Sequence, residues 1–409
     1  MTTSYFSQHK EVAILNLLFD DWIPTTTGFH SIQGCLKNAA KLQIHTSSMQ
    51  FASITRLLLA ACYQGKETSS KLLKGEISQK TFQDLERHKK QLDLNNGYLT
   101  CPDLTARVTT PAILMSEIPS GRTMVFDHHA RDDKKTVVSE AEIALRLVEF
   151  HCAAAAGGNS VTGYRTLSPC ADVMIGIAVG KTLLETLALN LVPDTAQSTA
   201  SWTLPRVRES DLKNQSRETA LSIAEGYTWV GQAVRLWNDG VGVARGFKLK
   251  NFADPMTAIA LNEKQQEMGA VHPKNLEPWL LGCYLTGFHS ILANTLRHAQ
   301  SLEIPYQVRV LAQVSSQKNK VKILERIDST FEPELLNHEL AEQVLKIRFL
   351  LARRDSEFAA RVFVSTMQDS LQEQKKEFSF NEFVDTYPFS TSRDQCLKIA
   401  KGSTGKGKS

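Results

Sequence analysis

The longest apolar stretch of the chain, residues 173–192, most constrains what the sequence can fold into. It is long enough to cross a membrane, but Lys181 and Glu185 lie near its centre. Each charge at the centre of a bilayer costs about 2.5–3.5 kcal/mol, which disfavours insertion. The stretch is therefore predicted to be a helix buried in a protein core. A chain of 409 residues is long enough to build a large core around it.

Composition and cysteine usage indicate a globular protein with reduced thiols. Hydrophobic residues make up 42% and charged residues 22%, both ordinary values, and the net charge is only +4. Any contact with nucleic acid must therefore come from local basic clusters. The seven cysteines show no CxxC spacing, and residues 1–12 lack the pattern of a signal peptide, so a cytoplasmic location without a zinc framework is expected. The cysteines are Cys35, Cys62, Cys101, Cys152, Cys170, Cys283 and Cys396.

Hydrophobic periodicity and capping signals predict a mixed α+β fold. Helices are expected at 49–62 and 79–92, and Ser139 with Glu142 forms a capping box that begins another helix. Strands are expected at 13–19, 227–236 and 307–313, and Asn95-Asn96-Gly97 is a turn.

The last part of the chain shows a different pattern. Apolar residues recur at helical spacing, and the final residues are polar and glycine-rich. The chain is thus predicted to divide into a large mixed α/β domain (1–330), a short helical bundle (331–400) and a disordered tail (401–409). The apolar stripe consists of Leu336, Leu340, Val344, Ile347 and Leu351.

Three motifs come close to catalytic or ligand-binding signatures. Gly176 and Gly180-Lys181-Thr182 enclose three residues where a phosphate-binding loop needs four, so a packed helix turn is expected. Asp127-His128-His129 has adjacent histidines on a loop, which rarely converge on one metal ion. Gly157-Gly158 lacks the spacing of a dinucleotide fold. The chain is therefore expected to have no enzymatic activity, metal or cofactor.

Six short motifs, in the same order along the chain, resemble the CasA family, the large subunit of the type I-E CRISPR Cascade complex. They cover roughly residues 13–330. Two departures are evident: residues 238–245 hold no cysteine cluster, and the region after Arg326 is shorter than the four-helix bundle of the family. The motifs are 15–24 (LNLLFDDWIP), Pro111 with Ser120-Gly121 and 125–128 (VFDH), 139–144 with 155–158 (AAGG), Ala220 with 226–229 (GYTW), 252–255 (FADP) and 322–326 (KILER).

This resemblance implies a non-catalytic subunit that recognises the protospacer-adjacent motif (PAM), helps to open target DNA and stabilises the R-loop. In RNA-guided complexes base pairing reads the sequence, and protein reads the short PAM duplex. The implied partners are a CRISPR guide RNA, target double-stranded DNA and the backbone, small and handle-binding Cascade subunits. The shorter C-terminal region suggests that a nuclease module on a neighbouring subunit supplies cleavage. No membrane partner is expected.

The resemblance also assigns candidate site residues. On the guide side, an aromatic ring can stack on a base of the RNA handle. On the DNA side, glycines permit close backbone approach, and lysines can neutralise phosphates. The guide-handle residues are Phe126, Asp127 and His128. The PAM and DNA residues are Gly157, Gly158, Lys248, Lys250, Asn251, Gln317, Lys318, Asn319 and Lys320.

Each assignment has a purely structural alternative. Phe126 could be a core residue, the glycines a plain turn, and the lysines a solvated face. At the level of the whole protein, two rival functions are open: a scaffold or adaptor without DNA contact, and a nucleotide-binding enzyme that uses Gly180-Lys181-Thr182.

Overall fold

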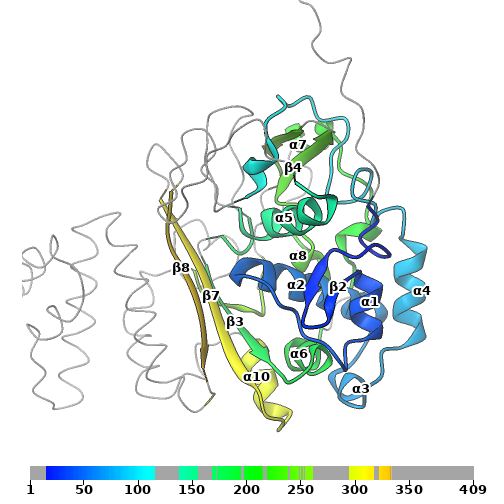
Figure 1. Ribbon diagram of the computed structural model, residues 1–409, viewed down its shortest axis with the longest axis vertical. Coiled ribbons are helices and arrows are strands. Elements are labelled where there is room, and N and C mark those ends of the chain that lie inside the picture. Colours follow the sequence, from blue (N-terminus) through cyan, green and yellow to red (C-terminus); the bar gives the residue numbers. More distant parts are fainter. Residues whose placement is uncertain are drawn as a thin grey trace, which may run out of the picture.

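The computed structural model describes a mixed helix and strand fold (Figure 1). The described residues are 15–115, 138–154, 168–171, 173–194, 198–214, 219–237, 240–247, 249, 252, 254–260, 294–316, 322–331 and 333.

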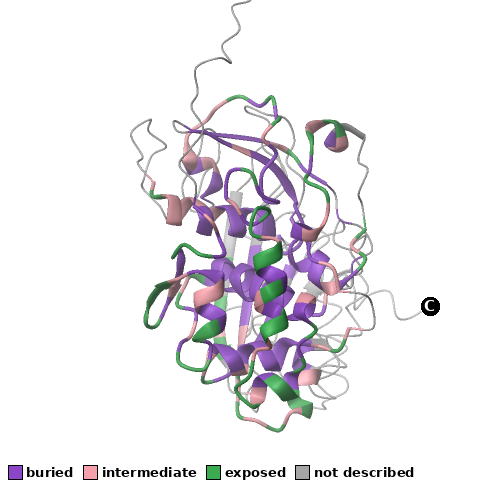
Figure 2. Ribbon diagram, turned by 90° about the vertical axis from the view of Figure 1, so that its right-hand side faces the viewer, coloured by how far each residue is buried: buried purple, intermediate pink, exposed green. Residues whose placement is uncertain are grey.

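Helix α2 (Ser48–Gly65) runs through the centre of this fold. Every residue of α2 except Gln64 is buried, and Figure 2 shows buried residues concentrated in the interior of the molecule. A helix that is buried on all sides must be surrounded by other elements of the protein. The helix predicted at 49–62 is therefore confirmed, and other elements pack around its length of about 27 Å.

A four-stranded antiparallel sheet packs beside α2. Its strands are β3 (Val173–Val179), β6 (Thr257–Ala260), β7 (Gln307–Ser316) and β8 (Lys322–Phe331), in the order β6-β3-β7-β8. Each neighbouring pair is antiparallel. The strand predicted at 307–313 is confirmed as β7. The KILER motif, expected at the entry to a helical bundle, instead lies in β8.

The apolar stretch 173–192 is buried as predicted, but it is not one helix. Its first part is β3, and its second part is helix α6 (Leu183–Asn190). The β-branched residues of the first part alternate along the chain and favour a strand. Thr182 then begins the helix, because its hydroxyl accepts a hydrogen bond from Glu185 N at 3.2 Å.

The other elements surround this core. The helices are α1 (Ile32–Lys37), α3 (Ser69–Leu73), α4 (Gln79–Arg87), α5 (Glu140–Ala153), α7 (Glu209–Asn214), α8 (Ile223–Tyr227) and α10 (Asn294–Ser301), with 3-10 helices η1 (Pro111–Leu114) and η2 (Ser201–Thr203). Two small antiparallel hairpins pair β1 (Ile23–Thr25) with β2 (Gly28–His30) and β4 (Gln232–Trp237) with β5 (Gly240–Arg245).

Local signals predicted some of these elements correctly. The N-cap half of the capping box is confirmed, since Ser139 Oγ accepts from Glu142 N at 3.2 Å at the start of α5, while Glu142 Oε1 accepts from Arg146 Nε at 2.6 Å. The helix predicted at 79–92 begins at Gln79 but ends at Arg87. The strand predicted at 227–236 is confirmed only from Gln232 onward, because Tyr227 closes α8.

The strand predicted at 13–19 is wrong over its described residues. Only Asn16 makes an isolated bridge, with Asp93, and a turn follows. The Asn16 side chain accepts from Leu18 N at 3.0 Å, and Asp20 Oδ2 accepts from Asn16 N at 2.7 Å. Such local side-chain bonds compete with strand pairing. The domain boundary near 330 and the C-terminal helical stripe cannot be compared, because residues 334–409 lie outside the described part.

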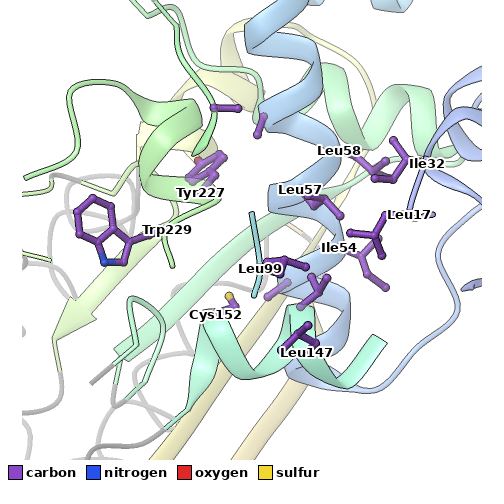
Figure 3. Close-up of a cluster of buried hydrophobic side chains, with 14 of the residues drawn as sticks. Leu17, Ile32, Ile54, Leu57, Leu58, Leu99, Leu147, Cys152, Tyr227 and Trp229 are labelled. Carbon is purple, nitrogen blue, oxygen red and sulfur yellow. The ribbon is translucent and has the colours of Figure 1, made fainter. Parts of the chain in front are cut away.

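One hydrophobic core joins the N-terminal segment to the helices (Figure 3). Leu17 and Ile32 lie beside Ile54 and Leu58 of α2, and Leu147 of α5 belongs to the same cluster. The combination of helices with an antiparallel sheet confirms the α+β class. Among the described residues no helix is both long and apolar enough to span a bilayer.

Because α2 is enclosed, truncating its core side chains is expected to destabilise the whole fold. Leu58 is fully buried, so Leu58→Ala should lower the free energy of unfolding by about 2–5 kcal/mol. Leu221 is 77% exposed and serves as the matched control, for which Leu221→Ala should change stability by less than about 0.5 kcal/mol. Urea unfolding followed by tryptophan fluorescence measures both, and equal stabilities would contradict the central place of α2.

Candidate functional site

All the predicted guide and DNA residues lie in four segments outside, or largely outside, the described residues. The structure nevertheless describes the residues that flank each segment. The four segments are named by their content. They are the aromatic segment (116–137, with Phe126, Asp127 and His128), the glycine segment (155–167, with Gly157 and Gly158), the lysine segment (248–253, with Lys248, Lys250 and Asn251) and the hairpin segment (317–321, with Gln317, Lys318, Asn319 and Lys320).

The two ends of the glycine segment lie side by side. Ser168 N donates to Ala154 O at 3.0 Å, and Cys170 N donates to Cys152 O at 2.7 Å. The Ser168 hydroxyl also donates to Phe150 O at 3.1 Å. The base of the glycine segment is therefore fixed on the last turn of α5.

The lysine segment begins next to this base. Gln232, the first residue of β4, donates from Nε2 to Ser168 Oγ at 3.3 Å. A Cβ atom on Gly246 would meet the Gln232 backbone at 2.6 Å, so only glycine permits this close approach of β4 to the start of the lysine segment. Phe247 O in turn accepts from Trp229 Nε1 at 3.1 Å.

Strand β7, which leads to the hairpin segment, contacts the last turn of α5 at the base of the glycine segment. Gln313 of β7 donates from Nε2 to Ala153 O at 3.1 Å, and both residues are buried. Gln313 precedes the end of β7 at Ser316 by about 10 Å of strand. The glycine, lysine and hairpin segments thus all leave the described core near one group of residues. We call this group the loop junction: Ala153, Ser168, Gln232, Phe247 and Gln313.

Apolar residues alternate with lysines along residues 247–250. Phe247 and Leu249 are both buried, as a half-buried alternating pattern requires. Neither Phe247 nor Leu249 belongs to a strand, however, although such alternation is typical of one.

The aromatic segment joins the opposite end of α5. It follows Met115 and leads into Ser139, the N-cap of α5. The 14 residues of α5 span about 21 Å. The structure therefore separates Ser139, which follows the predicted guide-handle residues, from the loop junction by the length of one helix.

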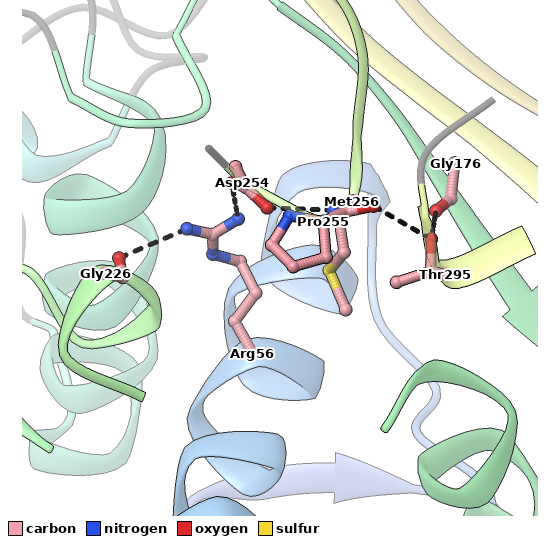
Figure 4. Close-up of polar contacts among 7 residues, drawn as sticks. All are labelled: Arg56, Gly176, Gly226, Asp254, Pro255, Met256 and Thr295. Atoms are coloured by element: carbon pink, nitrogen blue, oxygen red, sulfur yellow. Dashed lines mark hydrogen bonds and ion pairs between the residues drawn. The ribbon is translucent and has the colours of Figure 1, made fainter. Parts of the chain in front are cut away.

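A buried ion pair fixes the far end of the lysine segment (Figure 4). Arg56 of α2 pairs with Asp254, and the two side chains are only 1% and 6% exposed. Arg56 Nη2 also donates to Gly226 O at 3.2 Å, and its guanidinium lies 4.4 Å from the centre of the Tyr227 ring. Burial has the largest single effect and lowers the pKa of Arg56, but Asp254 and the smaller effects of Cys170, Cys152 and Tyr227 together outweigh it, so the pKa is raised and the guanidinium stays charged. Sequence reasoning missed this pair, although an arginine in an apolar helix is a visible signal.

The residues after Asp254 connect this pair to the sheet. Asp254 Oδ1 accepts from Met256 N at 2.9 Å, and Met256 O accepts from Gly176 N of β3 at 3.0 Å. Thr295 of α10 donates from its hydroxyl to Pro255 O at 3.2 Å and to Gly176 O at 3.3 Å. One short segment is therefore bonded to the central helix, the sheet and α10.

A neutral histidine links α5 to the loop junction. His151 Nε2 donates to Leu99 O at 2.8 Å, and His151 Nδ1 accepts from Gln232 N at 3.4 Å. Burial lowers the pKa of His151 to about 4, and the hydrogen bond to Leu99 O only partly opposes this effect. The uncharged ring is the form that can both donate and accept here.

The turn at Gly180-Lys181-Thr182 does not form a phosphate site. Glu185 Oε2 accepts from Lys181 N at 2.6 Å, and the Gln43 side chain donates to Gly180 O at 2.8 Å. A carboxylate therefore occupies the start of α6, where a phosphate would have to bind. The turn connects strand β3 to helix α6, so the predicted helix turn is wrong. Its hydrogen bonds disfavour the alternative function of a nucleotide-binding enzyme.

Comparisons with known proteins identify relatives over most of the chain. The family model described as CRISPR-associated protein Cse1 matches residues 16–392. The CRISPR-associated protein CasA/Cse1 of Thermus thermophilus is 28% identical over 348 residues, which is 75% of this chain and 69% of the relative.

Solved structures share the fold. CasA (Cse1) of Thermus thermophilus has a TM-score of 0.59 at 20% identity and covers 95% of this chain and 94% of its own. Cse1 of Thermobifida fusca has a TM-score of 0.58 at 16% identity, with 95% and 97% covered. A chain of a pre-nicking CRISPR RNA-guided surveillance complex has a TM-score of 0.61 at 14% identity, with 95% and 87% covered.

The neutral His151 predicts a specific loss of stability in acid. Its folded pKa of about 4 lies below its ordinary value of 6.5, so the unfolded state takes up the proton first and stability falls as the pH drops from about 6.5 towards 4. Between pH 7 and pH 5 this one group should cost about 2 kcal/mol. His151→Gln should reduce that loss in urea unfolding, whereas His45→Gln, at an exposed histidine, should not. An unchanged pH dependence in His151→Gln would refute the assignment.

Proposed function

Because the chain belongs to the CRISPR-associated Cse1 family, we propose that it acts as the non-catalytic large subunit of a type I-E CRISPR RNA-guided surveillance complex. In this role it recognises the PAM, helps to open target DNA and stabilises the R-loop. Its partners are the guide RNA, target double-stranded DNA and the other Cascade subunits.

The loop junction is the observation that supports this proposal most directly. Three segments distant in sequence carry the predicted DNA residues, and all three leave the described core near the last turn of α5. Binding residues on loops that a rigid scaffold positions are a common arrangement. A scaffold without DNA contact would not require basic and glycine-rich segments to share one base.

The residue types of these segments suit a short duplex. Lys248 and Lys250 supply charge for phosphates, which contributes affinity for any sequence. Gly157 and Gly158 allow backbone to approach a groove, which can contribute selectivity. Residues 317–320 supply polar and basic side chains next to strands that are being separated. The guide-handle role falls to Phe126, whose segment joins the other end of α5.

Replacing the aromatic ring should weaken assembly. Phe126→Ala removes the ring proposed to stack on a base of the guide RNA, an interaction of about 1–3 kcal/mol, and should weaken the affinity of the subunit for the rest of the complex by about 5–150-fold. Biolayer interferometry against the complex lacking this subunit measures the change. Phe29→Ala, at a ring that is 59% exposed on β2, is the control and should bind normally. Wild-type affinity in Phe126→Ala would show that the aromatic segment is not the anchor.

Removing the two lysines should weaken DNA binding without regard to sequence. In Lys248→Ala/Lys250→Ala, affinity should fall for PAM and non-PAM duplexes alike, and the slope of log K against log salt should decrease by about 0.9 for each phosphate that the protein no longer neutralises. Lys89→Ala/Lys90→Ala, at two exposed lysines after α4, is the matched control. Gel shifts with the assembled complex at several salt concentrations measure both effects, and normal binding by the first double variant would exclude the lysine segment.

The scaffold alternative makes a different prediction for the same gel shifts. If the subunit only braces its neighbours, its removal should leave the PAM preference of the complex unchanged. A complex that loses its PAM preference when this subunit is omitted, and regains it when the subunit is added back, supports the proposed function.

A further inference from the structure

The Arg56–Asp254 pair has no role in the nucleic-acid binding proposed so far. It lies in the interior, where neither partner can touch a nucleic acid. A buried ion pair is weak evidence for stability, because the cost of desolvation offsets much of the attraction. Such a pair can instead specify one conformation, because removing either partner leaves an unpaired charge.

The lysine segment is held at both of its ends by groups from other elements. At the first end, Trp229 Nε1 donates to Phe247 O. At the second end, Arg56 pairs with Asp254. Within the segment, Phe252 packs so tightly against Gly226 that a Cβ atom on Gly226 would come within 2.0 Å of the ring.

Arg56 joins the groups that hold the second end. Its guanidinium binds Asp254, donates to Gly226 O and stacks on Tyr227, so it fixes the segment against α8. It also lines a cavity of about 20 Å³ together with His151, Cys152 and Pro169, next to the base of the glycine segment. One side chain of α2 thus contacts the second end of the lysine segment and reaches the base of the glycine segment.

We propose that Arg56 is a positioning residue that fixes the lysine segment relative to the glycine segment and thereby determines the PAM selectivity of the assembled complex. The effect of Arg56 on PAM selectivity rests on the function proposed above. Arg56 acts through Asp254 and does not itself contact DNA. The planar guanidinium is required, because a lysine cannot engage a carboxylate and a carbonyl with the same fixed geometry.

The test separates positioning from a merely structural role by removing both charges together. Arg56→Met/Asp254→Asn leaves no unpaired buried charge, and the asparagine oxygen can still accept from Met256 N. The matched control is Arg309→Met/Asp328→Asn. Arg309 makes the same three kinds of interaction: to Asp328 at 2.7 Å, to Thr46 O at 3.3 Å and to the Phe51 ring at 4.3 Å. It lies at the end of β7 away from the hairpin segment.

The first measurement needs no DNA. Amide hydrogen exchange of residues 247–256 in the isolated subunit should be at least tenfold faster in Arg56→Met/Asp254→Asn and unchanged in the control. Unchanged exchange in both variants would overturn the proposal. The hydrogen-exchange experiment tests the positioning role even if the wild-type complex shows no PAM preference. That result would refute the proposed function but not the positioning role of Arg56.

The second measurement uses the assembled complex and two duplexes that differ only in the PAM. The ratio of the two affinities should fall about tenfold in Arg56→Met/Asp254→Asn and partly recover in Arg56→Lys, which restores a cation opposite Asp254. The control should keep the wild-type ratio. A wild-type ratio in Arg56→Met/Asp254→Asn would show that the pair only contributes to stability, and would overturn the proposal.

Discussion

A charged arginine inside a fully enclosed helix is the constraint on which much of the structure depends. The guanidinium of Arg56 cannot reach water, because all but one residue of α2 is buried. Leaving such a charge unpaired costs about 3–5 kcal/mol, so an acidic partner must come to it. Asp254 is that partner, about two hundred residues away in sequence, and its position brings the start of β6 and the helix α10 against the centre of the fold.

The described core holds the bases of the segments that carry the predicted binding residues. The core supplies buried amide groups, such as those of Gln232 and Gln313, which fix the bases of three segments by hydrogen bonds. Buried hydrogen bonds hold such bases firmly because breaking one leaves an unsatisfied polar group. The loop junction is therefore the part of the molecule where fold and proposed function meet.

Local sequence signals predicted elements whose determinants are local. The N-cap at Ser139 and the apolar run of α2 specify helices through neighbouring residues, and both helices are confirmed. The prediction of one helix at 173–192 was wrong, because hydrophobicity alone does not distinguish a buried strand from a buried helix. The decisive signals were the alternating β-branched residues, which favour the strand, and Thr182, which begins the helix. The site was predictable only as short motifs. Its common base depends on hydrogen bonds such as Gln313 to Ala153, which join residues 160 positions apart and leave no local pattern.

Helix α5 sets the distance between the points at which the aromatic and glycine segments join the core. The aromatic segment enters its N-terminus, and the glycine segment leaves its C-terminus, about 21 Å away. The helix cannot shorten or bend easily, because Arg146 bonds Glu142 and Glu149 along it, and Leu147 and Phe150 are packed in the core. His151 fixes its last turn to Leu99 and Gln232. The separation between the points at which the aromatic and glycine segments join α5 is thus a property of the rigid core.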